Sequence, residues 1–574
     1  MITLGINAAF HDSAACLVKD GQLIAAAEDE RFTHIKHGKR PVPFSAWELP
    51  FHAIHYCLKE ADIHLSDVDQ VAYSFDPYLV MERPELESRE VRLPLDPLAV
   101  PMTEKWKSPW DPLFHSAILN APGMLADGYP HHLQDRLAGT SRNDERFHFL
   151  DHHLCHAASA FLPSPFSEAA VMTLDGRGET ATSTFSMGHG MQLERLRQVD
   201  MPHSLGMLYE QVTKYLGFLH SSDEYRVMAL ASYGKPVYAN IFRDMVHLGN
   251  DGGYTIDEER FAQHFGPPRS KGAPFTMLHF DIAHSLQVVL EESVLELASW
   301  LRRETGAKQL CFAGGVALNC VLNARLRDAG IFDDIWVQPA SGDAGTALGA
   351  ALWQDAQARG ESGKAFTMEH AYWGPAFSDE EIITFLRWAK VPYRRMQDVA
   401  RETAELLLQN RVVGWFQGRM EFGPRALGAR SILASPIDPK MQAKLNEVKD
   451  REDFRPVAPA VLEEEACNWF QSAGASPFML FVHQVKEDKK AQIPAVCHVD
   501  GTARIQTVNR TQHARYYDLL KAFQELSGVP VIINTSFNTL GKPIVCTPRD
   551  ALECFWSSPF DVLVMGDCLI EKKP

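Results

Sequence analysis

Apolar and polar residues alternate in short blocks through the first 30 residues. Residues 2–8, 14–18 and 23–27 are apolar, and Asp20-Gly21 separates the last two blocks with a typical hairpin turn. Blocks of this length bounded by turn residues are typical of buried strands. The pattern therefore predicts three adjacent strands that begin a sheet.

Further along the chain, blocks of strand length alternate with stretches of helical periodicity. Residues 281–305 form the clearest helix, because apolar side chains recur on one face three and four residues apart. Such alternation predicts an α/β layer structure, and two strand-rich lobes joined by helices are typical of the actin-like architecture. Further strands are predicted at 71–74, 147–150, 169–174, 182–187, 309–312, 334–337, 412–416, 431–434, 457–461, 529–533 and 562–565, and further helices at 152–161, 317–329, 346–358, 441–449 and 516–526.

Two long stretches lack a clear period. Residues 76–143 are rich in Pro, Trp and Met, and residues 238–277 form a second irregular stretch. Because irregular segments of this length are usually lids or binding insertions, both are expected to shape a ligand site. The polar, glycine-containing stretch 358–366 marks a predicted boundary between two domains, 1–360 and 361–574. No internal sequence repeat is evident.

Composition and charge narrow the class of protein. The chain has 574 residues, and a prior of roughly 150 residues per domain predicts about two to four domains. Apolar residues make up 45% and charged residues 22%, which is an ordinary globular balance. The formal net charge of −17 argues against nucleic acid or an anionic membrane as the main partner.

The N-terminus and the cysteines indicate the compartment. Residues 1–7 carry no basic region, so they predict a strand and not a signal peptide, and no run of roughly 18 or more apolar residues occurs. Ten cysteines, from Cys16 to Cys568, include no C-x-x-C pair. We therefore expect a cytoplasmic protein with reduced, mostly buried thiols, no membrane span and no zinc ribbon.

Two histidines and two aspartates form a candidate metal site. His152 and His156 lie four residues apart in a predicted helix, which stacks both imidazoles on one face, whereas His153 is turned by about 100°. Asp175 ends a predicted strand, and Asp343 lies in a strand-to-helix turn. Two imidazoles with one or two carboxylates suit Fe(II), Mn(II) or Zn(II) better than Mg(II). The alternative is that the histidines are ordinary polar residues at the start of a helix.

Glycine turns follow two of the predicted strands. Gly176 and Gly178, in Asp-Gly-Arg-Gly-Glu, would let a ligand approach the backbone, and Gly314-Gly315 leads into a helix near Asn319. Free amides at such turns favour anions, and the flat glycine pair could lie against an adenine or a ribose. The alternative is a tight turn that binds nothing.

The C-terminal half concentrates cations against the acidic background. Arg419, Arg425 and Arg430 lie among glycines, and Arg504 lies beside an apolar segment. Guanidinium groups bind phosphate or carboxylate oxygens through paired hydrogen bonds, so an anion pocket is predicted. The alternative is a set of surface salt bridges, which contribute little. Further candidates are Lys449, Arg451 and Arg455, and Asn534 and Ser536 after strand 529–533.

Several motifs together resemble one enzyme family. Phe-His-Asp-Ser-Ala begins at Phe10, Asp-His-His-Leu-Cys-His at Asp151, Asp-Gly-Arg-Gly-Glu at Asp175, Gly-Gly-Val-Ala-Leu-Asn at Gly314 and Ser-Gly-Asp-Ala-Gly at Ser341. In this order, and over nearly the whole chain, they resemble the NodU/CmcH family of O-carbamoyltransferases. That family includes the tobramycin, cephalosporin and nodulation-factor enzymes.

One segment departs from the family pattern. Residues 225–231 read Tyr-Arg-Val-Met-Ala-Leu-Ala, where the family often has Gly-Lys-Val-Met-Gly-Leu-Ala. Arg226 keeps the positive charge but replaces a point charge with a planar fork. The role of this position is therefore left open.

The resemblance implies an ATP-dependent O-carbamoyltransferase with an actin-like N-terminal domain and a YrdC-like C-terminal domain. In the C-terminal domain, carbamoyl phosphate and Mg-ATP would give carbamoyladenylate and pyrophosphate. The carbamoyl group would then reach a hydroxyl of a small-molecule acceptor at an iron site in the N-terminal domain, along an interior path that excludes water. An antibiotic, a toxin or a glycan would fit as the acceptor, and a homodimer is among the expected assemblies.

The resemblance also implies roles for individual residues. His11 would be the base that activates the acceptor hydroxyl, and Lys36 would lie near the acceptor. The metal would be held by His152, His156 and Asp343, with Asp175 beside it. The carbamoyladenylate in the N-terminal domain would contact Asp175, Gly176, Gly178, Glu179, Glu210, Gly314, Gly315 and Asn319. Carbamoyl phosphate and ATP would be bound by Arg419, Arg425, Lys449, Arg455, Arg504, Asn534 and Ser536.

Other functions share parts of this pattern. An actin-like sugar kinase and a tRNA-threonylcarbamoylating enzyme are the main alternatives, and the acidic composition argues against a tRNA substrate. A hydrogenase-maturation carbamoyltransferase would need C-x-x-C zinc pairs, and a metallopeptidase would need H-E-x-x-H; the sequence has neither. A nucleotide-sensing regulator is the non-enzymatic alternative.

Overall fold

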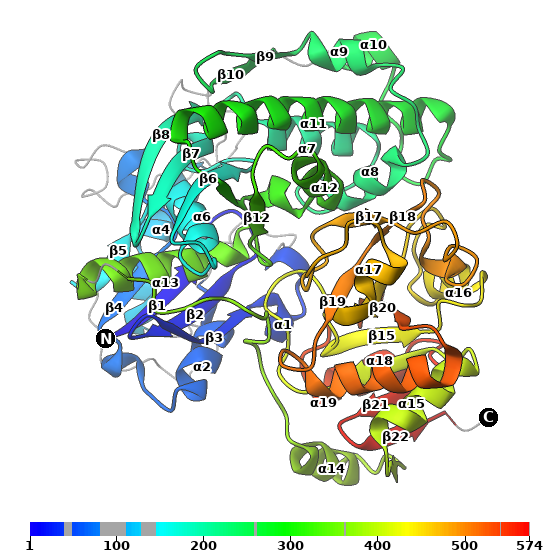
Figure 1. Ribbon diagram of the computed structural model, residues 1–574. Helices are drawn as coiled ribbons and strands as arrows, with labels where there is room; N and C mark the ends of the chain where they lie inside the picture. Colours follow the sequence, from blue (N-terminus) through cyan, green and yellow to red (C-terminus); the bar gives the residue numbers. More distant parts are fainter. Residues whose placement is uncertain are drawn as a thin grey trace.

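The computed structural model describes residues 1–38, 49–80, 111–127, 145–257, 261–360, 363–539 and 541–572. Two five-stranded sheets belong to the N-terminal part of the chain, and an eight-stranded sheet belongs to the C-terminal part (Figure 1). The fold is α/β, as predicted.

The first sheet confirms the three strands predicted at the start of the chain. It has the order β3-β2-β1-β4-β5, in which β1 to β3 form an antiparallel meander and β4 and β5 continue in parallel. Alternate side chains of β2 pack towards α2 (Phe51–Glu60) and towards α13 (Ala344–Arg359), so the sheet is covered on both faces. Its strands are β1 (Ile2–Asn7), β2 (Ala14–Lys19), β3 (Gln22–Glu28), β4 (Gln70–Tyr73) and β5 (Phe147–Phe149).

The second sheet repeats this topology. Its order is β12-β11-β6-β7-β8, again with three antiparallel strands followed by two parallel ones. Each lobe has its own five-stranded sheet, and the two sheets share one topology. This confirms the predicted two-lobed, actin-like arrangement, although the sequence shows no repeat. The strands are β6 (Glu168–Leu174), β7 (Ala181–His189), β8 (Gln192–Asp200), β11 (Gln309–Ala313) and β12 (Asp334–Val337).

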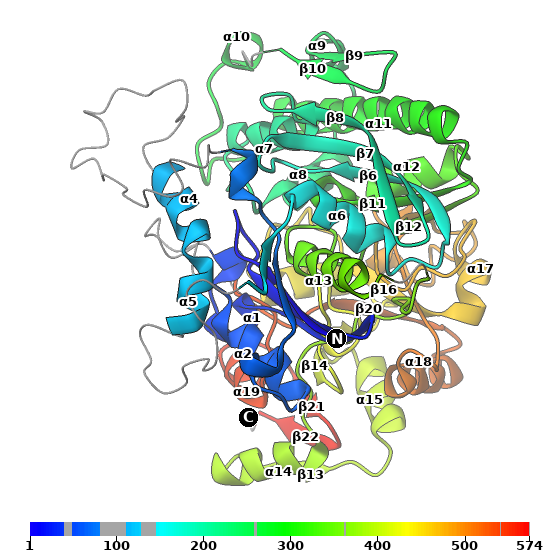
Figure 2. The ribbon, with the colours of Figure 1, turned by 90° about the vertical axis from the view of Figure 1, so that its left-hand side faces the viewer.

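Helices α6 (His152–Phe161) and α13 lie between the two sheets (Figures 1 and 2). They approach each other closely at Gly349, where a Cβ atom would lie 1.8 Å from the carbonyl oxygen of Cys155. The opposite face of the second sheet is covered by α7 (Leu205–Tyr215), α8 (Glu224–Ala231), α11 (Met277–Thr305) and α12 (Cys320–Asp328). The first turns of α6 and α13 therefore meet where the lobes face each other.

The C-terminal sheet is mixed and has the order β13-β22-β21-β14-β15-β20-β16-β19. Helices α15 (Val399–Leu408) and α18 (Ala514–Ser527) pack side by side against it, and α14 (Asp379–Trp388), α16 (Met441–Val448) and α19 (Pro548–Trp556) complete this part. The strands are β13 (Arg394–Arg395), β14 (Val413–Phe416), β15 (Arg430–Ala434), β16 (Ala458–Leu462), β19 (Gln506–Val508), β20 (Val531–Ser536), β21 (Val562–Met565) and β22 (Cys568–Glu571), and β17 (Val482–Gln484) pairs with β18 (Thr502–Arg504) separately.

Some stretches differ from their predictions. Residues 238–277 contain short elements, namely α9 (Ala239–Arg243), β9 (Val246–Leu248), β10 (Tyr254–Ile256) and α10 (Phe261–Phe265), which lie outside α11 at the top of Figure 1. The helix predicted at 317–329 is a 3-10 turn (Gly315–Leu318) followed by α12. Within 76–143, a 3-10 turn (Pro77–Leu79), α4 (Asp111–Leu119) and α5 (Ala121–Asp127) are described, and 81–110 and 128–143 lie outside the described residues.

Two further predictions concern thiols and membranes. Seven of the ten cysteines are buried, which confirms the predicted burial. Among the described residues, no helix has both the length and the apolar character needed to cross a bilayer.

Candidate functional site

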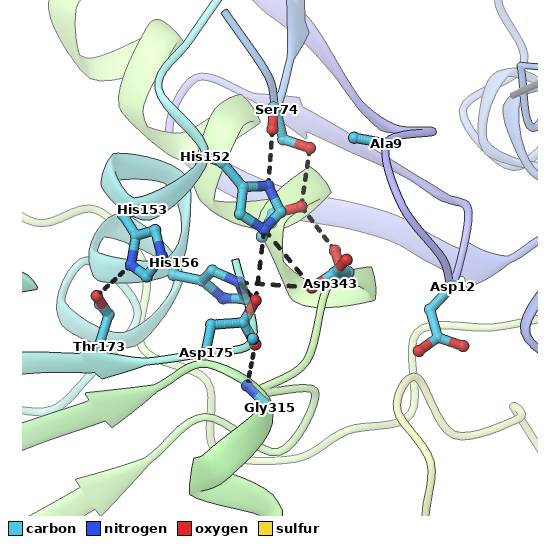
Figure 3. A network of polar contacts seen from close by, with 12 residues as sticks. Ala9, Asp12, Ser74, His152, His153, His156, Thr173, Asp175, Gly315 and Asp343 are labelled. Atoms are coloured by element: carbon cyan, nitrogen blue, oxygen red, sulfur yellow. Dashed lines mark hydrogen bonds and ion pairs between the residues drawn. The ribbon is translucent and has the colours of Figure 1, made fainter. Parts of the chain in front are cut away.

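Four buried side chains converge where the lobes meet (Figure 3). His152 and His156 lie one turn apart in α6, Asp175 follows the end of β6, and Asp343 precedes α13. Each imidazole Nε2 lies 3.6 Å from Asp343 Oδ1 and 3.9 Å from Asp175 Oδ2. The structure thus brings the four predicted ligands together.

The cluster has the character of a metal site. Among the described residues, His152 Nε2, both ring nitrogens of His156 and both carboxylate oxygens of Asp343 are buried without a hydrogen-bond partner. Leaving a buried polar group unpaired costs about 1–3 kcal/mol, and a cation between these atoms would satisfy several of them at once. Nitrogen and carboxylate donors in this number suit Fe(II), Mn(II) or Zn(II).

Surrounding contacts fix the orientation of the cluster. His152 Nδ1 lies 3.0 Å from the carbonyl oxygen of Ser74, and Asp175 Oδ1 accepts a hydrogen bond of 2.6 Å from the amide of Gly315. Such contacts hold ligands in place before an ion binds. His153 points away from the cluster and bonds to the Thr173 hydroxyl at 2.7 Å (Figure 3), in agreement with the helical spacing.

His11 lies beside this cluster. Its Nδ1 atom is 2.9 Å from Asp12 Oδ2 and 3.8 Å from Asp343 Oδ2. Burial lowers the pKa of His11, but the carboxylates of Asp343 and Asp12 outweigh it and raise the pKa to about 10; Asp343 likewise outweighs burial at His152 and raises its pKa to about 9. The cluster therefore stabilises positive charge strongly. A divalent cation would neutralise the charge of the Asp343 carboxylate in place of the protons on His11 and His152.

The predicted adenylate-binding residues divide into two groups. Gly176, Glu210, Gly315 and Asn319 line a cavity that also reaches Asp175 and Asp343. Gly178, Glu179 and Gly314 are not among the described lining residues.

Two of the three residues outside the lining, Gly314 and Glu179, contact the segments that carry the cluster. Gly314 has φ +94°, and a Cβ atom there would lie 2.1 Å from the carbonyl oxygen of Leu174. Glu179 accepts hydrogen bonds from the amides of His152 and Asp76, and burial raises its pKa to about 7. This carboxylate therefore holds the start of α6 in place.

The cavity extends into the C-terminal part and becomes cationic there. Arg425, Lys449, Arg455, Arg504, Asn534 and Ser536, predicted from the sequence, all line it, together with Arg451, to which the family resemblance assigned no role. Burial and the nearby Arg504 lower the pKa of Arg425 to about 9, and burial and Arg455 lower that of Arg451 to about 9. Partly buried like charges gathered this closely are stabilised by a polyanion.

Two arginines from the same glycine-rich segment lie elsewhere. Arg419 donates to the carbonyl oxygen of Trp373 at 3.1 Å and the hydroxyl of Tyr56 at 3.0 Å, and it lies 3.2 Å from Glu60. It is not among the described residues that line the cavity, so its contacts favour a structural role. Arg430 is buried and donates to backbone carbonyl groups.

Lys36 and Arg226 lie where the two parts meet. Lys36 Nζ lies 5.7 Å and the Arg455 guanidinium 4.7 Å from the ring centre of Tyr225. Arg226 donates to Glu452 across the junction at 2.8 Å. Lys36, Tyr225 and Arg226 line the same cavity, whose volume is about 520 Å³. One continuous space thus connects the histidine–aspartate cluster with the arginine cluster.

Comparisons with known proteins identify the family of the chain. Residues 2–352 match the family described as carbamoyltransferase N-terminus, and residues 404–572 match carbamoyltransferase C-terminus. The chain is 40% identical to the nodulation protein NolNO of Sinorhizobium fredii, covering 99% of this chain and 80% of that protein. It is 42% identical to an uncharacterized protein of Synechocystis (99% and 96%) and 30% identical to nodulation protein U of Rhizobium tropici (95% and 92%).

The chain therefore belongs to the carbamoyltransferase family, and it is a carbamoyltransferase enzyme. Solved structures resemble it weakly: HypF in its phosphate- and nucleotide-bound form has 14% identity and a TM-score of 0.34 over 63% of this chain and 56% of that chain. A ROK hexokinase from Thermus thermophilus has 15% identity and a TM-score of 0.29 over 63% of this chain and the whole of that chain. Likenesses this weak say nothing about the reaction.

Proposed function

We propose that this enzyme is an ATP-dependent O-carbamoyltransferase that works in two steps at the two ends of one cavity. The supporting observation is the continuity of the cavity, which reaches from Asp175 and Asp343 of the histidine–aspartate cluster to the arginine cluster (Arg425, Arg451, Arg455 and Arg504). Carbamoyladenylate is a mixed anhydride that water destroys, so a route inside the protein protects it between the steps.

In the first step, the cationic end binds carbamoyl phosphate and Mg-ATP. Carbamoyl phosphate loses its phosphate to a water molecule, and the carbamate oxygen attacks the α-phosphorus of ATP. The products are carbamoyladenylate, pyrophosphate and phosphate. Arg425, Arg455 and Arg504 supply the charge-assisted hydrogen bonds that two phosphorylated substrates require.

The side chain of Asn534 suits the carbamoyl group in this step. Its Nδ2 donates to the carbonyl oxygen of Ala426 at 3.2 Å and to Gln506 Oε1 at 2.8 Å, which fixes the orientation of the amide. The Oδ1 atom is buried and has no hydrogen-bond partner among the described residues. The carbamoyl NH₂ group is a donor that would satisfy it, whereas an acetyl group has none.

In the second step, the acceptor hydroxyl attacks the carbamoyl carbon beside the metal cluster. The new C–O bond replaces the bond to the AMP phosphate, AMP leaves, and His11 takes the hydroxyl proton. General-base catalysis of this kind contributes about 10²–10⁴-fold. A divalent ion such as Fe(II), held by His152, His156, Asp175 and Asp343, would supply Lewis-acid polarisation of the carbamoyl oxygen.

Incubation with ATP and carbamoyl phosphate tests the first step. We expect release of pyrophosphate, and release of ADP with phosphorylation of a sugar would instead support a kinase. Replacement His11→Asn should leave pyrophosphate release intact and reduce carbamoyl transfer by about 10²–10⁴-fold. Transfer that persists in His11→Asn would contradict the role of His11 as the base.

The acceptor can be found in the cell. Deletion of the gene should remove metabolites that differ from their precursors by one carbamoyl group, which mass spectrometry detects. A hydroxylated small molecule is expected. Loss of a modified tRNA nucleoside instead would support the threonylcarbamoylation alternative.

A further inference from the structure

A turn of unusual backbone conformation carries His11. Phe10 and Asp12, on either side of it, have φ of 48° and 52°, and both therefore lie in the left-handed region. Each such residue other than glycine costs roughly 1–2 kcal/mol and persists only where other contacts hold it. Asn7 supplies such contacts, because its Nδ2 donates to the carbonyl oxygens of His11 at 3.0 Å and Asp12 at 3.1 Å.

The side chain of Asp12 lies between two imidazoles. Its Oδ2 atom is 2.9 Å from His11 Nδ1, and its Oδ1 atom is 2.7 Å from His37 Nδ1. His37 also has a left-handed backbone, with φ of 59°, and its amide donates to Glu30 at 2.7 Å. Three residues in the left-handed region thus maintain one chain of contacts, His11–Asp12–His37.

These contacts determine which nitrogen of His11 is free. An ionised carboxylate can only accept hydrogen bonds, so the proton of a neutral His11 ring stands on Nδ1. The lone pair is then left on Nε2, and His11 lines the cavity. A carboxylate that fixes the tautomer and the plane of a base in this way raises the rate without contacting the substrate.

We infer that Asp12 is a positioning residue for carbamoyl transfer, which holds His11 in its Nδ1–H tautomer and is itself held by His37. The inference rests on the proposed function, because it assumes that His11 is the base. Asp12 acts through His11 and contributes nothing to the first step at the cationic end.

The replacement Asp12→Asn is a sharp test because asparagine also tolerates the left-handed backbone. Its amide has one oxygen in place of two equivalent ones, so one of the two histidines faces an NH₂ donor and is driven to the other tautomer. The replacement Asp12→Glu keeps the carboxylate and should restore part of the activity. His37→Asn leaves the contact between Asp12 and His11 and should have the smaller effect.

The acceptor need not be known for this experiment. The probe is ¹⁴C-carbamoyl phosphate with ATP and a deproteinised extract of the producing cells, and the reading is acid-stable label in the products. For Asp12→Asn we expect a loss of about 10²–10⁴-fold in maximal rate, with the half-saturating amount of extract unchanged. Pyrophosphate release, bound metal and the thermal midpoint should stay at wild-type values, and Asp12→Glu should exceed Asp12→Asn.

Three results would overturn the inference: wild-type labelling by Asp12→Asn, a change in half-saturation alone, or a loss that accompanies loss of metal or of folding and that Asp12→Glu does not restore. His11→Asn, assayed in parallel, separates this outcome from failure of the proposed function. If His11→Asn still transfers the label, the base assignment is wrong. If His11→Asn transfers no label while Asp12→Asn transfers label at the wild-type rate, only the positioning role of Asp12 is wrong.

Discussion

At the scale of single residues, the unpaired atoms of the histidine–aspartate cluster carry the argument for a metal. The distances of 3.6 to 3.9 Å between imidazole nitrogens and carboxylate oxygens are too long for good hydrogen bonds. They leave space for one ion that contacts all four groups. Burial raises the pKa of Asp343, but the neighbouring His11 and His152 outweigh burial and lower it. Without an ion, the protons on these two imidazoles compensate the charge of the Asp343 carboxylate.

The replacement His156→Ala tests the ligand role. Removing one of four ligands should lower metal affinity by more than the factor of about 10–100 that is typical of losing a supporting contact. Metal content by mass spectrometry after dialysis measures this. His153→Asn is the matched control in the same helix, because His153 bonds to Thr173 and should retain the metal. Equal metal contents in the two variants would refute the ligand assignment.

The replacement Arg504→Ala tests the cationic end. The loss of one charge-assisted hydrogen bond, about 1.5–3 kcal/mol, should reduce pyrophosphate release by about 10–100-fold. The variant should still transfer the carbamoyl group from carbamoyladenylate added from outside. Arg419→Ala is the control, since Arg419 contacts Trp373 and Tyr56 outside the cavity lining, and it should keep pyrophosphate release. The reverse order of effects would contradict this placement.

The sequence pattern predicted which side chains could form a site better than it predicted where each side chain points. The spacing of His152 and His156 and the strand-end position of Asp175 made these side chains candidates for one metal site, and the structure brings them together with Asp343. The same reasoning grouped Arg419 with Arg425, because both lie among glycines. Whether a guanidinium faces the cavity or the carbonyl group of Trp373 depends on tertiary contacts that the sequence pattern does not contain.

At the scale of elements, the position of α6 against α13 decides the geometry of the cluster. His152 and His156 lie in the first two turns of α6, Asp343 directly precedes α13, and the two helices pack closely at Gly349. A methyl group there would meet the carbonyl oxygen of Cys155, which lies one residue before His156. The distance between the helices is therefore limited by the absence of a side chain.

The replacement Gly349→Ala should weaken both folding and metal binding. Overpacking of this kind typically destabilises by about 1–3 kcal/mol, and a displaced α6 moves the histidines away from Asp343. Thermal unfolding and metal titration measure the two effects together. Gly474→Ala is the control, because a Cβ atom there would meet no other atom within 4 Å and the backbone of Gly474 is not left-handed. Unchanged metal affinity in Gly349→Ala would show that the contact between α6 and α13 does not determine the geometry of the site.

Some elements were predicted with the bounds that the structure has, whereas others were missed, among them helices α2, α7, α14 and α15. The bounds predicted for α6 and β12 agree with the structure. Strand β8 (Gln192–Asp200) was not predicted, because it lies at the edge of its sheet and most of its side chains are exposed. An exposed edge strand lacks the apolar alternation on which the prediction depends.

At the scale of the whole molecule, the repeated sheet topology explains where the histidine–aspartate cluster lies. In each five-stranded sheet the central strand, β1 or β6, is followed by a turn at the same edge, and these turns carry His11 and Asp175. The sequence could not reveal this duplication, because the two lobes share strand order and not residues. The ion pair of Arg226 and Glu452 then joins the second lobe to the C-terminal part beside the common cavity.

A mixing experiment tests whether the two ends work as one enclosed system. His11→Asn should make carbamoyladenylate but not use it, and Arg504→Ala should use it but make little. If the intermediate stays inside the cavity, equal amounts of the two variants should transfer label from ¹⁴C-carbamoyl phosphate no faster than Arg504→Ala does alone, although each keeps one activity. Transfer that rises with total protein concentration towards the wild-type rate would mean that the intermediate escapes, and the continuous cavity would then not serve as its path.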